Sequence, residues 1–293
     1  MTLTAADLIG HNGAAESKYQ MLLEWHGVHT NIVNKEFIGD CPFYDCPSVL
    51  EGKPDKFTMN RQTAEWQCFM CGRKGNAYGF IREVHRNSLE QTTPHHLQEL
   101  RELRKNAIDL LDLVEMQLAF NPSTKEWTAP AWNVEGKIVN LYLWRESYVP
   151  SSGKAYRQFL SSPSMSHVPY GIHRIRTGTN RPIWVCEGQW DYLALASLFR
   201  RLDLTNKFDI LAAPGAGTFP RKYLSVFNGR EVIICYDNDP AGQAGTDSLI
   251  GNMASNGIMP TGVKRLEWPV GLDQGFDISD VITKLPQGLW KKQ

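Results

Sequence analysis

The C-terminal part of the chain alternates short apolar runs with amphipathic stretches. Each apolar run has the length of a buried strand, and the stretch that follows it has the residue spacing of a helix. Strands that alternate with helices predict a parallel or mostly parallel α/β sheet. The strands are expected at residues 183–186, 208–212 and 232–236, and the helices at 191–199 and 242–256.

Upstream of this region, a helical pattern gives way to an extended one. Thr93-Pro94 has the residue types of an N-cap and a first helical turn. Apolar residues then recur at steps of three and four from Leu97 to Leu118, which predicts an amphipathic helix that is either unbroken or has one break. The aromatic and β-branched stretch from Trp127 to Tyr148 predicts strands around a turn at residues 135–136.

Four of the six cysteines form two close pairs near the N-terminus. Four residues separate Cys41 from Cys46, two separate Cys68 from Cys71, and twenty-one lie between the pairs. In a cytosolic chain this spacing is typical of metal ligands rather than of disulfides. Four thiolates fill a tetrahedral zinc site, so the pattern predicts a structural Zn²⁺; the alternative is four unliganded thiols. Gly72 stands where a tight turn needs a positive φ.

Acidic residues follow the predicted strands. Because ligands gather at the carboxyl ends of parallel strands, these side chains are expected to converge on one spot. Crowded carboxylates repel one another unless divalent cations neutralise them, so the pattern predicts a Mg²⁺ site. Two of them, Asp191 and Asp280, have the alternative role of helix caps. The residues concerned are Glu187, Asp191, Asp237, Asp239, Asp277 and Asp280.

Charge is distributed unevenly, although 31 basic and 31 acidic residues cancel. Between residues 145 and 181 six basic side chains stand against one acid, a net +5. A basic segment followed by an acidic cluster suits a protein that holds a phosphate backbone and binds cations. No apolar run approaches the roughly 18 residues that span a bilayer, and the first residues do not resemble a secretory signal. A soluble, cytoplasmic protein without a membrane partner is therefore expected, with Cys186 and Cys235 as inert core thiols.

Several stretches resemble a known family. Glu187-Gly188-x-x-Asp191 and the Tyr-Asp-Asn-Asp-Pro-Ala-Gly run at 236–242 resemble the TOPRIM signature of DnaG-type primases, type IA and II topoisomerases and some nucleases. The cysteine module and three other stretches are similar to DnaG-type primases in particular. These stretches are Cys41-Pro42-Phe43, Cys68-Phe69-Met70-Cys71-Gly72 with Gly75-Asn76-Ala77, residues 156–163 (YRQFLSSP), residues 168–172 (VPYGI) and residues 276–281 (FDISDV).

The chain also departs from the family pattern. The usual second zinc ligand is a histidine three residues after the first cysteine, where this chain has Tyr44, and Cys46 would take over its role. The family's basic motif is not evident near residues 121–132, and no Walker loop with Lys-Ser/Thr indicates a fused helicase motor. The resemblance is to a stand-alone primase of the kind that phages or mobile elements carry.

The resemblance implies a fold and a division of the chain. The fold class is α/β, or α+β overall, with a small zinc ribbon, a helical linker and a primase core that contains a mostly parallel TOPRIM sheet. The expected parts are residues 1–86 for the N-terminal segment and zinc-binding domain and 87–120 for the linker. Residues 121–180 would form the N-terminal subdomain of the core, and 181–293 the TOPRIM subdomain.

The resemblance also implies roles. Asp237 and Asp239 would be direct ligands of Mg²⁺ or Mn²⁺, and Glu187 would complete the ligand set or take a proton. Asp191, Asp277 and Asp280 would support them or hold a further ion. Template or nucleoside triphosphates would be held by Arg145, Lys154, Arg157 and Arg174, although Arg174 also fits a plain surface turn.

The function implied is synthesis of short RNA primers on single-stranded DNA from NTPs, for replication, with a replicative helicase as a partner in trans. It would take place in the cytoplasm of a bacterium or a phage-infected cell. Two alternatives remain open. One is a TOPRIM nuclease, and the other is a non-catalytic zinc-bearing DNA-binding module of a replication system.

Overall fold

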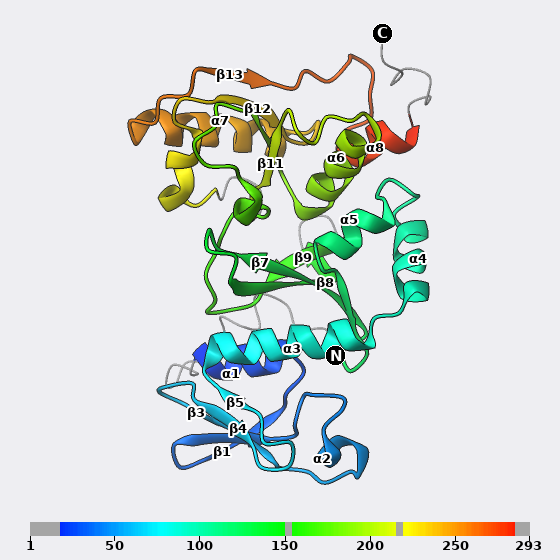
Figure 1. Ribbon diagram of the computed structural model, residues 1–293, viewed down its shortest axis with the longest axis vertical. Coiled ribbons are helices and arrows are strands. Elements are labelled where there is room, and N and C mark those ends of the chain that lie inside the picture. The colour runs from blue at the N-terminus through cyan, green and yellow to red at the C-terminus, as the bar shows by residue number, and fades with distance from the viewer. Residues whose placement is uncertain (1–17, 150–153, 215–218, 285–293) are drawn as a thin grey trace. The chain divides into compact units, whose positions relative to one another are not determined.

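The computed structural model describes residues 18–149, 154–214 and 219–284, with the backbone alone for 146–149 and 154–158. The chain divides into two compact units, each built from separate segments. Figure 1 labels the helices and strands. Unit 1 draws on residues 1–92, 117–130 and 138–166, and unit 2 on 93–116, 131–137 and 167–293. The four-part division by residue range stays a prediction.

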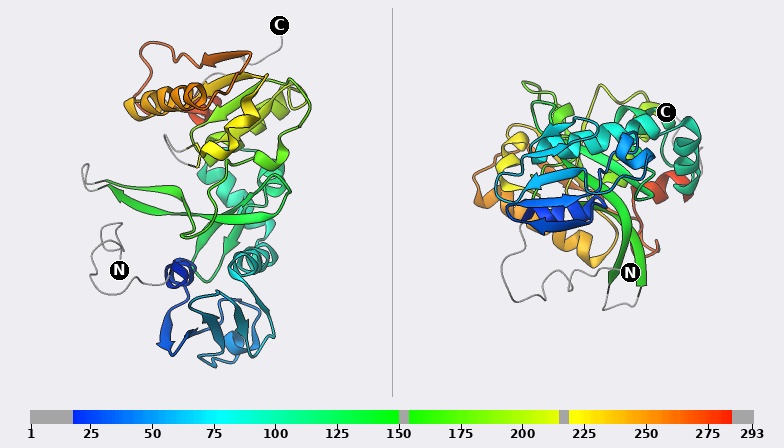
Figure 2. Two further views of the ribbon diagram at one scale, coloured as in Figure 1. Left: turned by 90° about the vertical axis from the view of Figure 1, so that its left-hand side faces the viewer. Right: turned by 90° about the horizontal axis from the view of Figure 1, so that it is seen from below.

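Unit 1 contains a small antiparallel sheet in the order β1-β2-β3-β4-β5, which is the zinc ribbon. A second sheet has the order β6-β7-β8-β9, and its β8 and β9 form a long antiparallel hairpin (Figure 2). The turn expected at 135–136 precedes β8, and Gly136 has φ +71°. The elements are α1 (Lys18–Trp25), β1 (Thr30–Val33), β2 (Glu36–Gly39), α2 (Pro47–Leu50), β3 (Phe57–Asn60), β4 (Trp66–Cys68), β5 (Lys74–Gly75), α3 (Ala77–Gln91), β6 (Ala119–Asn121), β7 (Glu126–Trp132), β8 (Ile138–Val149) and β9 (Lys154–Ser161).

Helix α3 organises the core of unit 1, and the sequence pattern did not predict it. Its buried positions combine apolar Phe80, Ile81 and Val84 with polar His85 and Ser88. The polar residues interrupt the apolar stripe, so helical periodicity is hidden. The helix contacts both the ribbon strand β5 and strands β6 and β8, and the ribbon shares one hydrophobic cluster with residues of β8.

Unit 2 contains a four-stranded parallel sheet in the order β11-β10-β12-β13. This confirms the α/β prediction, and each strand and helix expected in this region is present within a few residues of its expected bounds. The elements are α4 (Pro94–Leu103), α5 (Leu110–Glu115), the 3-10 helix η1 (Ile172–Arg174), β10 (Ile183–Cys186), α6 (Gln189–Arg201), β11 (Asp209–Ala212), the 3-10 helix η2 (Arg221–Phe227), β12 (Glu231–Cys235), α7 (Pro240–Ser255), β13 (Gly262–Arg265) and α8 (Ile278–Lys284).

The expected amphipathic helix before this sheet is two helices. Thr93 caps α4 with a capping box, accepting from the backbone N–H of His96, as the residue types predicted. The helix ends at Leu103, and α5 begins at Leu110, so the break lies between them. Leu111 and Val114 of α5 are about half exposed. Within the described residues, no helix is both long and apolar enough to cross a membrane.

Candidate active site and zinc centre

The four N-terminal cysteines form a compact cluster in unit 1. Their sulfur atoms all lie within 4.8 Å of one another, and Sγ of Cys46 is 3.6 Å from Sγ of Cys68. Sulfur atoms around a tetrahedral zinc ion, each at about 2.3 Å from the metal, are separated by about 3.8 Å. The cluster therefore fits one structural zinc ion.

Local turns bring these cysteines together. Cys68 ends β4, and the turn after it returns through Gly72, whose φ of +72° and N–H to the carbonyl of Cys68 (3.0 Å) close the knuckle. The positive φ expected of Gly72 is confirmed. Cys46 is the N-cap of α2, and its sulfur lies 3.0 Å from Oγ of Ser48.

The structure places Tyr44 outside the cluster. Its side chain is 46% exposed, whereas Cys46 is fully buried. Asn87 of α3 accepts from the backbone N–H of Tyr44 at 2.9 Å and donates to Asp45 at 2.7 Å, which fixes the loop that carries Cys46. The position that holds a histidine in the resembled family therefore faces solvent here.

Three of the four thiols are buried and that of Cys71 is half-buried, which couples metal binding to protonation. Burial raises the pKa of Cys71 to about 11 and also raises the pKa of Cys41. Because zinc binds thiolates, its binding has to release these protons and becomes more favourable as the pH rises.

Most aromatic side chains in and next to the ribbon belong to its core. Trp66 and Phe80 are buried and contact each other edge to face. Tyr78 is half-buried, and its hydroxyl lies 3.0 Å from Oγ of Ser166. Phe69 differs, because its ring is 64% exposed next to the zinc knuckle.

In unit 2 the parallel register places the first acidic residues side by side. Cys186 of β10 pairs with Cys235 of β12, so both strands end at the same level of the sheet. Glu187 follows the first strand, and its Oε2 accepts a hydrogen bond from the N–H of Asp237 at 3.3 Å. Both cysteines are buried, as expected for core thiols.

Asp239 and Gly242 shape the turn after β12. Asp239 is the N-cap of α7 and accepts from the N–H of Gly242 at 2.7 Å, with Pro240 in the first turn. A Cβ at position 242 would lie 2.3 Å from the carbonyl oxygen of Asp237. Only glycine allows this close approach, so the helix start fixes the backbone of Asp237.

A bridge brings the last acidic pair to the same place. Asn238 pairs with Phe276, and its N–H donates to the carbonyl of Phe276 at 2.9 Å. Asp277 follows directly, and its Oδ1 accepts from the N–H of Asp280 at 2.7 Å at the start of α8. Asp277 thus caps this helix, whereas Asp280 lies 3.0 Å from the ammonium group of Lys284.

The acidic residues disfavour ionisation of one another. Burial, and then the neighbouring carboxylates, raise the pKa of Asp237 to about 9. Burial and the charge of Asp277 raise the pKa of Asp191 to about 8, and burial raises the pKa values of Glu187 and Asp277 as well.

The side chain of Asp191 is 7% exposed, and its Oδ1 has no hydrogen-bond partner. It lies in the first turn of α6 and does not act as a helix cap. A cation would satisfy such a group, so these side chains fit a divalent metal.

Arg104, which the sequence did not single out, belongs to this electrostatic environment. Its guanidinium lies 4.7 Å from the ring centre of Trp190, the residue before Asp191. Burial lowers the pKa of Arg104, while Asp191, Asp277 and Asp280 act against that shift. Arg104 follows α4, 87 positions before Asp191, so no local motif links the two.

The basic residues predicted to hold nucleic acid occupy different environments. Arg145 stacks 4.2 Å over Trp25, donates to its carbonyl, and pairs with Glu126 at 2.7 Å, all within unit 1. Lys154 and Arg157 belong to β9, but their side chains lie outside the described residues. Arg174 pairs with Glu115 in unit 2. Their roles in binding stay predictions.

Comparisons with known proteins support two domains and a fold. Residues 23–104 match the CHC2 zinc finger, and residues 184–282 match the Toprim-like family. An uncharacterised protein of Mycoplasma genitalium is 23% identical over 177 residues, which are 60% of this chain and 78% of that protein.

Among solved structures, the DnaG catalytic core is 16% identical with a TM-score of 0.51, over 71% of this chain and 75% of that one. The RNA polymerase domain of Mycobacterium tuberculosis primase DnaG is 12% identical with a TM-score of 0.51, over 73% of this chain and 80% of that one. This chain thus combines matches to a CHC2 zinc finger and a Toprim-like domain with a fold similar to that of the DnaG primase core.

Proposed function

We propose that this protein synthesises short RNA primers on single-stranded DNA by divalent-metal-dependent nucleotidyl transfer. The observation that carries the proposal is the acidic cluster at the carboxyl ends of β10 and β12, where Glu187 hydrogen-bonds the backbone of Asp237. The zinc centre and the DnaG-like fold favour priming over other TOPRIM reactions. The proposed partners are a single-stranded template, NTPs and a replicative helicase in trans.

The acidic residues divide the work of the reaction. Asp237 and Asp239 would hold the cation, because Asp239 uses one carboxylate oxygen as a helix cap and keeps the other for a ligand. Bound Mg²⁺ or Mn²⁺ would lower the pKa of an attacking 3′-hydroxyl and stabilise negative charge at the α-phosphate. Glu187, whose pKa burial raises, would complete the ligand set or accept the hydroxyl proton.

The remaining predicted residues would position the substrates. Asp191 and Asp277 would orient the ligand set, with Asp280 held by Lys284. Lys154, Arg157 and Arg145 would lie along the template or the incoming triphosphate. Exposed Phe69, beside the zinc cysteines, is the ribbon aromatic available for stacking on template bases.

The test is incubation of the full chain with single-stranded DNA of mixed sequence, labelled NTPs and Mg²⁺ or Mn²⁺. A ladder of short, alkali-labile RNA products that needs both template and metal supports the proposal. Shortened DNA without RNA would instead indicate a TOPRIM nuclease. Tight DNA binding with neither product would indicate a non-catalytic replication module.

A further inference from the structure

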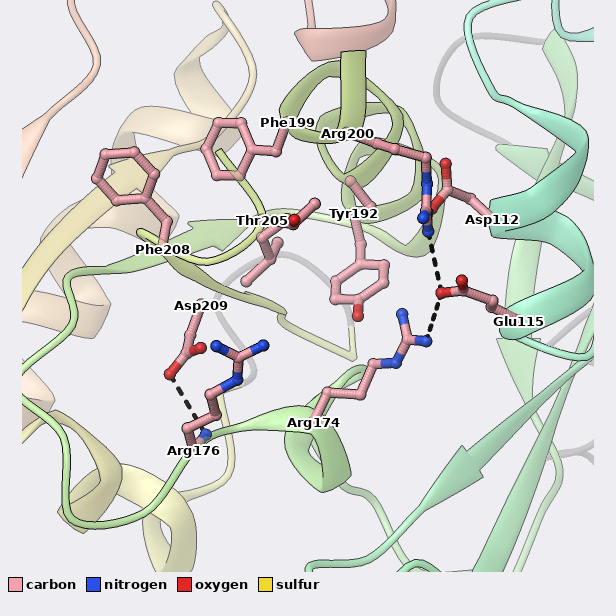
Figure 3. A pocket seen from close by; sticks show the side chains of 12 residues that line it. Asp112, Glu115, Arg174, Arg176, Tyr192, Phe199, Arg200, Thr205, Phe208 and Asp209 are labelled. Carbon is pink, nitrogen blue, oxygen red and sulfur yellow. Dashed lines mark hydrogen bonds and ion pairs between the residues drawn. The ribbon is translucent and has the colours of Figure 1, made fainter. Parts of the chain in front are cut away.

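A cavity of about 380 Å³ lies in unit 2, apart from the acidic cluster. Its lining comes from η1, α5, α6 and the start of β11 (Figure 3). Asp209 and Ile210 are the first two residues of β11, whereas the acidic residues follow the last residues of β10 and β12. Since the sheet is parallel, the cavity and the acidic cluster lie at opposite ends of it.

Two carboxylates of the cavity are already occupied by arginines. Glu115 lies 2.7 Å from the guanidinium of Arg174 and 3.0 Å from that of Arg200. Asp112 accepts from Arg200 at 2.9 Å and from Ser197 at 2.6 Å. Burial opposes ionisation of Glu115, but the two arginines hold its pKa below the usual value. Both acids therefore act as fixed anchors that orient the arginines.

Arg176 has a different kind of partner. Both of its terminal nitrogens lie 3.3 Å from Oδ1 of Asn206, which is a neutral amide oxygen. The carboxylate of Asp209 accepts from the backbone N–H of Arg176, but its charge is neutralised by a buried ion pair with Arg230. The guanidinium groups of Arg174, Arg176 and Arg200 thus outnumber the remaining carboxylates, those of Asp112 and Glu115, by one, and the cavity keeps an excess positive charge.

A hydroxyl and an aromatic wall complete the cavity. Burial raises the pKa of Tyr192 to about 12, so its hydroxyl stays protonated and can donate a hydrogen bond. Figure 3 shows this hydroxyl directed toward Arg174, with Arg176 extending from the same segment of chain into the cavity. Phe199 and Phe208 form the opposite wall with ring centres 5.2 Å apart.

We propose that this cavity binds a mononucleotide through its terminal phosphate, as a second site in addition to the proposed priming site. Arg174, which the sequence assigned to template or triphosphate binding, would instead hold the phosphate here. It would do so together with Arg176 and the hydroxyl of Tyr192, because planar guanidinium groups suit phosphate oxygens. The nucleoside would lie toward Phe208. The cavity volume is within the range of small-ligand sites. One excess positive charge suits a single phosphate group better than the many phosphates of a nucleic-acid strand.

The experiment measures binding of AMP, GMP and inorganic phosphate to the full chain by calorimetry, in EDTA. Without divalent cations the acidic cluster offers a phosphate no metal to coordinate, so binding reports the arginine cavity. We expect one saturable nucleotide site per chain, with inorganic phosphate at least about tenfold weaker. Absence of nucleotide binding overturns the proposal, and equal affinity for phosphate and nucleotide overturns its nucleoside part.

Variants identify the site. Arg176→Gln should weaken AMP binding about tenfold or more, as loss of a charge-assisted contact does. Tyr192→Phe should weaken it less, and Arg221→Gln, at an exposed arginine of the same unit, should leave it unchanged. Melting without ligand checks folding, since Arg176 partners only a neutral amide there. Unchanged affinity in a folded Arg176→Gln protein overturns the assignment to this cavity.

Two further measurements separate this proposal from its alternatives. An oligonucleotide without terminal phosphates that displaces AMP would mean that the cavity tracks a strand, which contradicts the mononucleotide proposal. Asp239→Asn should bind AMP in EDTA like the wild type. AMP binding in EDTA does not depend on primer synthesis. The proposed function can therefore be wrong while the cavity still binds a nucleotide, and the cavity can fail to bind a nucleotide while the proposed function holds.

Discussion

The cysteine cluster and the acidic cluster both bring metal-binding side chains together, but they do so in opposite ways. The four cysteines lie within 31 residues of sequence, are placed by local turns, and already stand at metal-binding distance. The carboxylates come from three elements over more than 90 residues, and within the described chain they form no group as tight as the cysteines. Burial raises the pKa values of Cys41 and Cys71, so these two thiols stay protonated until metal binds. Burial also acts on Cys46, but its hydrogen bonds with Ser48 lower the pKa of that thiol to about 7.

The carboxylates, in contrast, destabilise the protein when no metal is bound, because they lie close together and are partly buried. Burial and mutual repulsion raise the pKa values of Asp237 and Asp191, and Arg104 supplies only part of the missing charge. The difference teaches that one site uses metal to hold a fold together, while the other uses the fold to hold charges that metal must neutralise.

The largest effect is expected when the cysteine cluster is broken. Cys46→Ala should abolish stoichiometric zinc and unfold the ribbon of unit 1, because bound metal supplies much of the folding free energy of so small a module. Elemental analysis and limited proteolysis measure the two losses. Tyr44→Ala is the control and should keep one zinc per chain, since Tyr44 faces solvent. Zinc lost from Tyr44→Ala but kept by Cys46→Ala would reverse the ligand assignment.

The next largest effect concerns catalysis. Asp239→Asn keeps the N-cap of α7, because asparagine caps as well as aspartate, but it removes a negative ligand. Primer synthesis should fall by on the order of 10² to 10³ with an unchanged melting temperature. Wild-type primer yield from this variant would remove Asp239 from the catalytic site.

A backbone change should disturb the acidic cluster without touching a charge. Gly242→Ala places a methyl group 2.3 Å from the carbonyl oxygen of Asp237, so the helix or the turn must shift. We expect a cost of about 1–3 kcal/mol in the free energy of unfolding and a clear loss of priming. Gly251→Ala, in the same helix with open space around it, should be neutral or slightly stabilising. Equal behaviour of the two variants in denaturant titrations would argue against the close approach.

Removal of Arg104 should expose the repulsion that it offsets. In EDTA, Arg104→Gln should melt below the wild type, because Asp191, Asp277 and Asp280 lose a nearby positive charge. Saturating Mg²⁺ should reduce this difference in melting temperature between Arg104→Gln and the wild type. Arg101→Gln, one turn earlier near the end of α4, serves as the matched control. A difference that Mg²⁺ leaves unchanged would assign Arg104 to packing on Trp190 alone.

The smallest effect is a dependence of stability on pH. The pKa of Asp237 is raised from 3.8 to about 9, so folding is favoured while the group is protonated. Its contribution is fully present below pH 3.8 and is lost progressively as the pH rises through about 9. In EDTA, Asp237→Asn should therefore gain in melting temperature over the wild type across that window and match it at the acidic end. A constant difference at every pH would contradict the raised pKa.

The sequence predicted the parts whose signals are local. Alternating strands and helices, the paired cysteines, Gly72, the cap at Thr93 and the acids after each strand are all visible within short windows. It missed α3, because His85 and Ser88 occupy buried positions that periodicity expects to be apolar. It missed Arg104, since only the fold brings that residue to Asp191, and it could not reveal that Arg145 stacks on Trp25.

The shared core of unit 1 has a consequence for how the chain is made. Phe80, Ile81 and Val84 of α3 belong to a hydrophobic cluster that also contains Leu141 and Leu143 of β8. A ribosome adds about 5–20 residues per second, so these apolar groups are synthesised several seconds before their partners. During that interval the nascent ribbon exposes a hydrophobic surface that β8 will later cover. A fragment that ends with the zinc-finger match at residue 104 would keep this surface exposed permanently, and it should aggregate or recruit chaperones even when its zinc is bound.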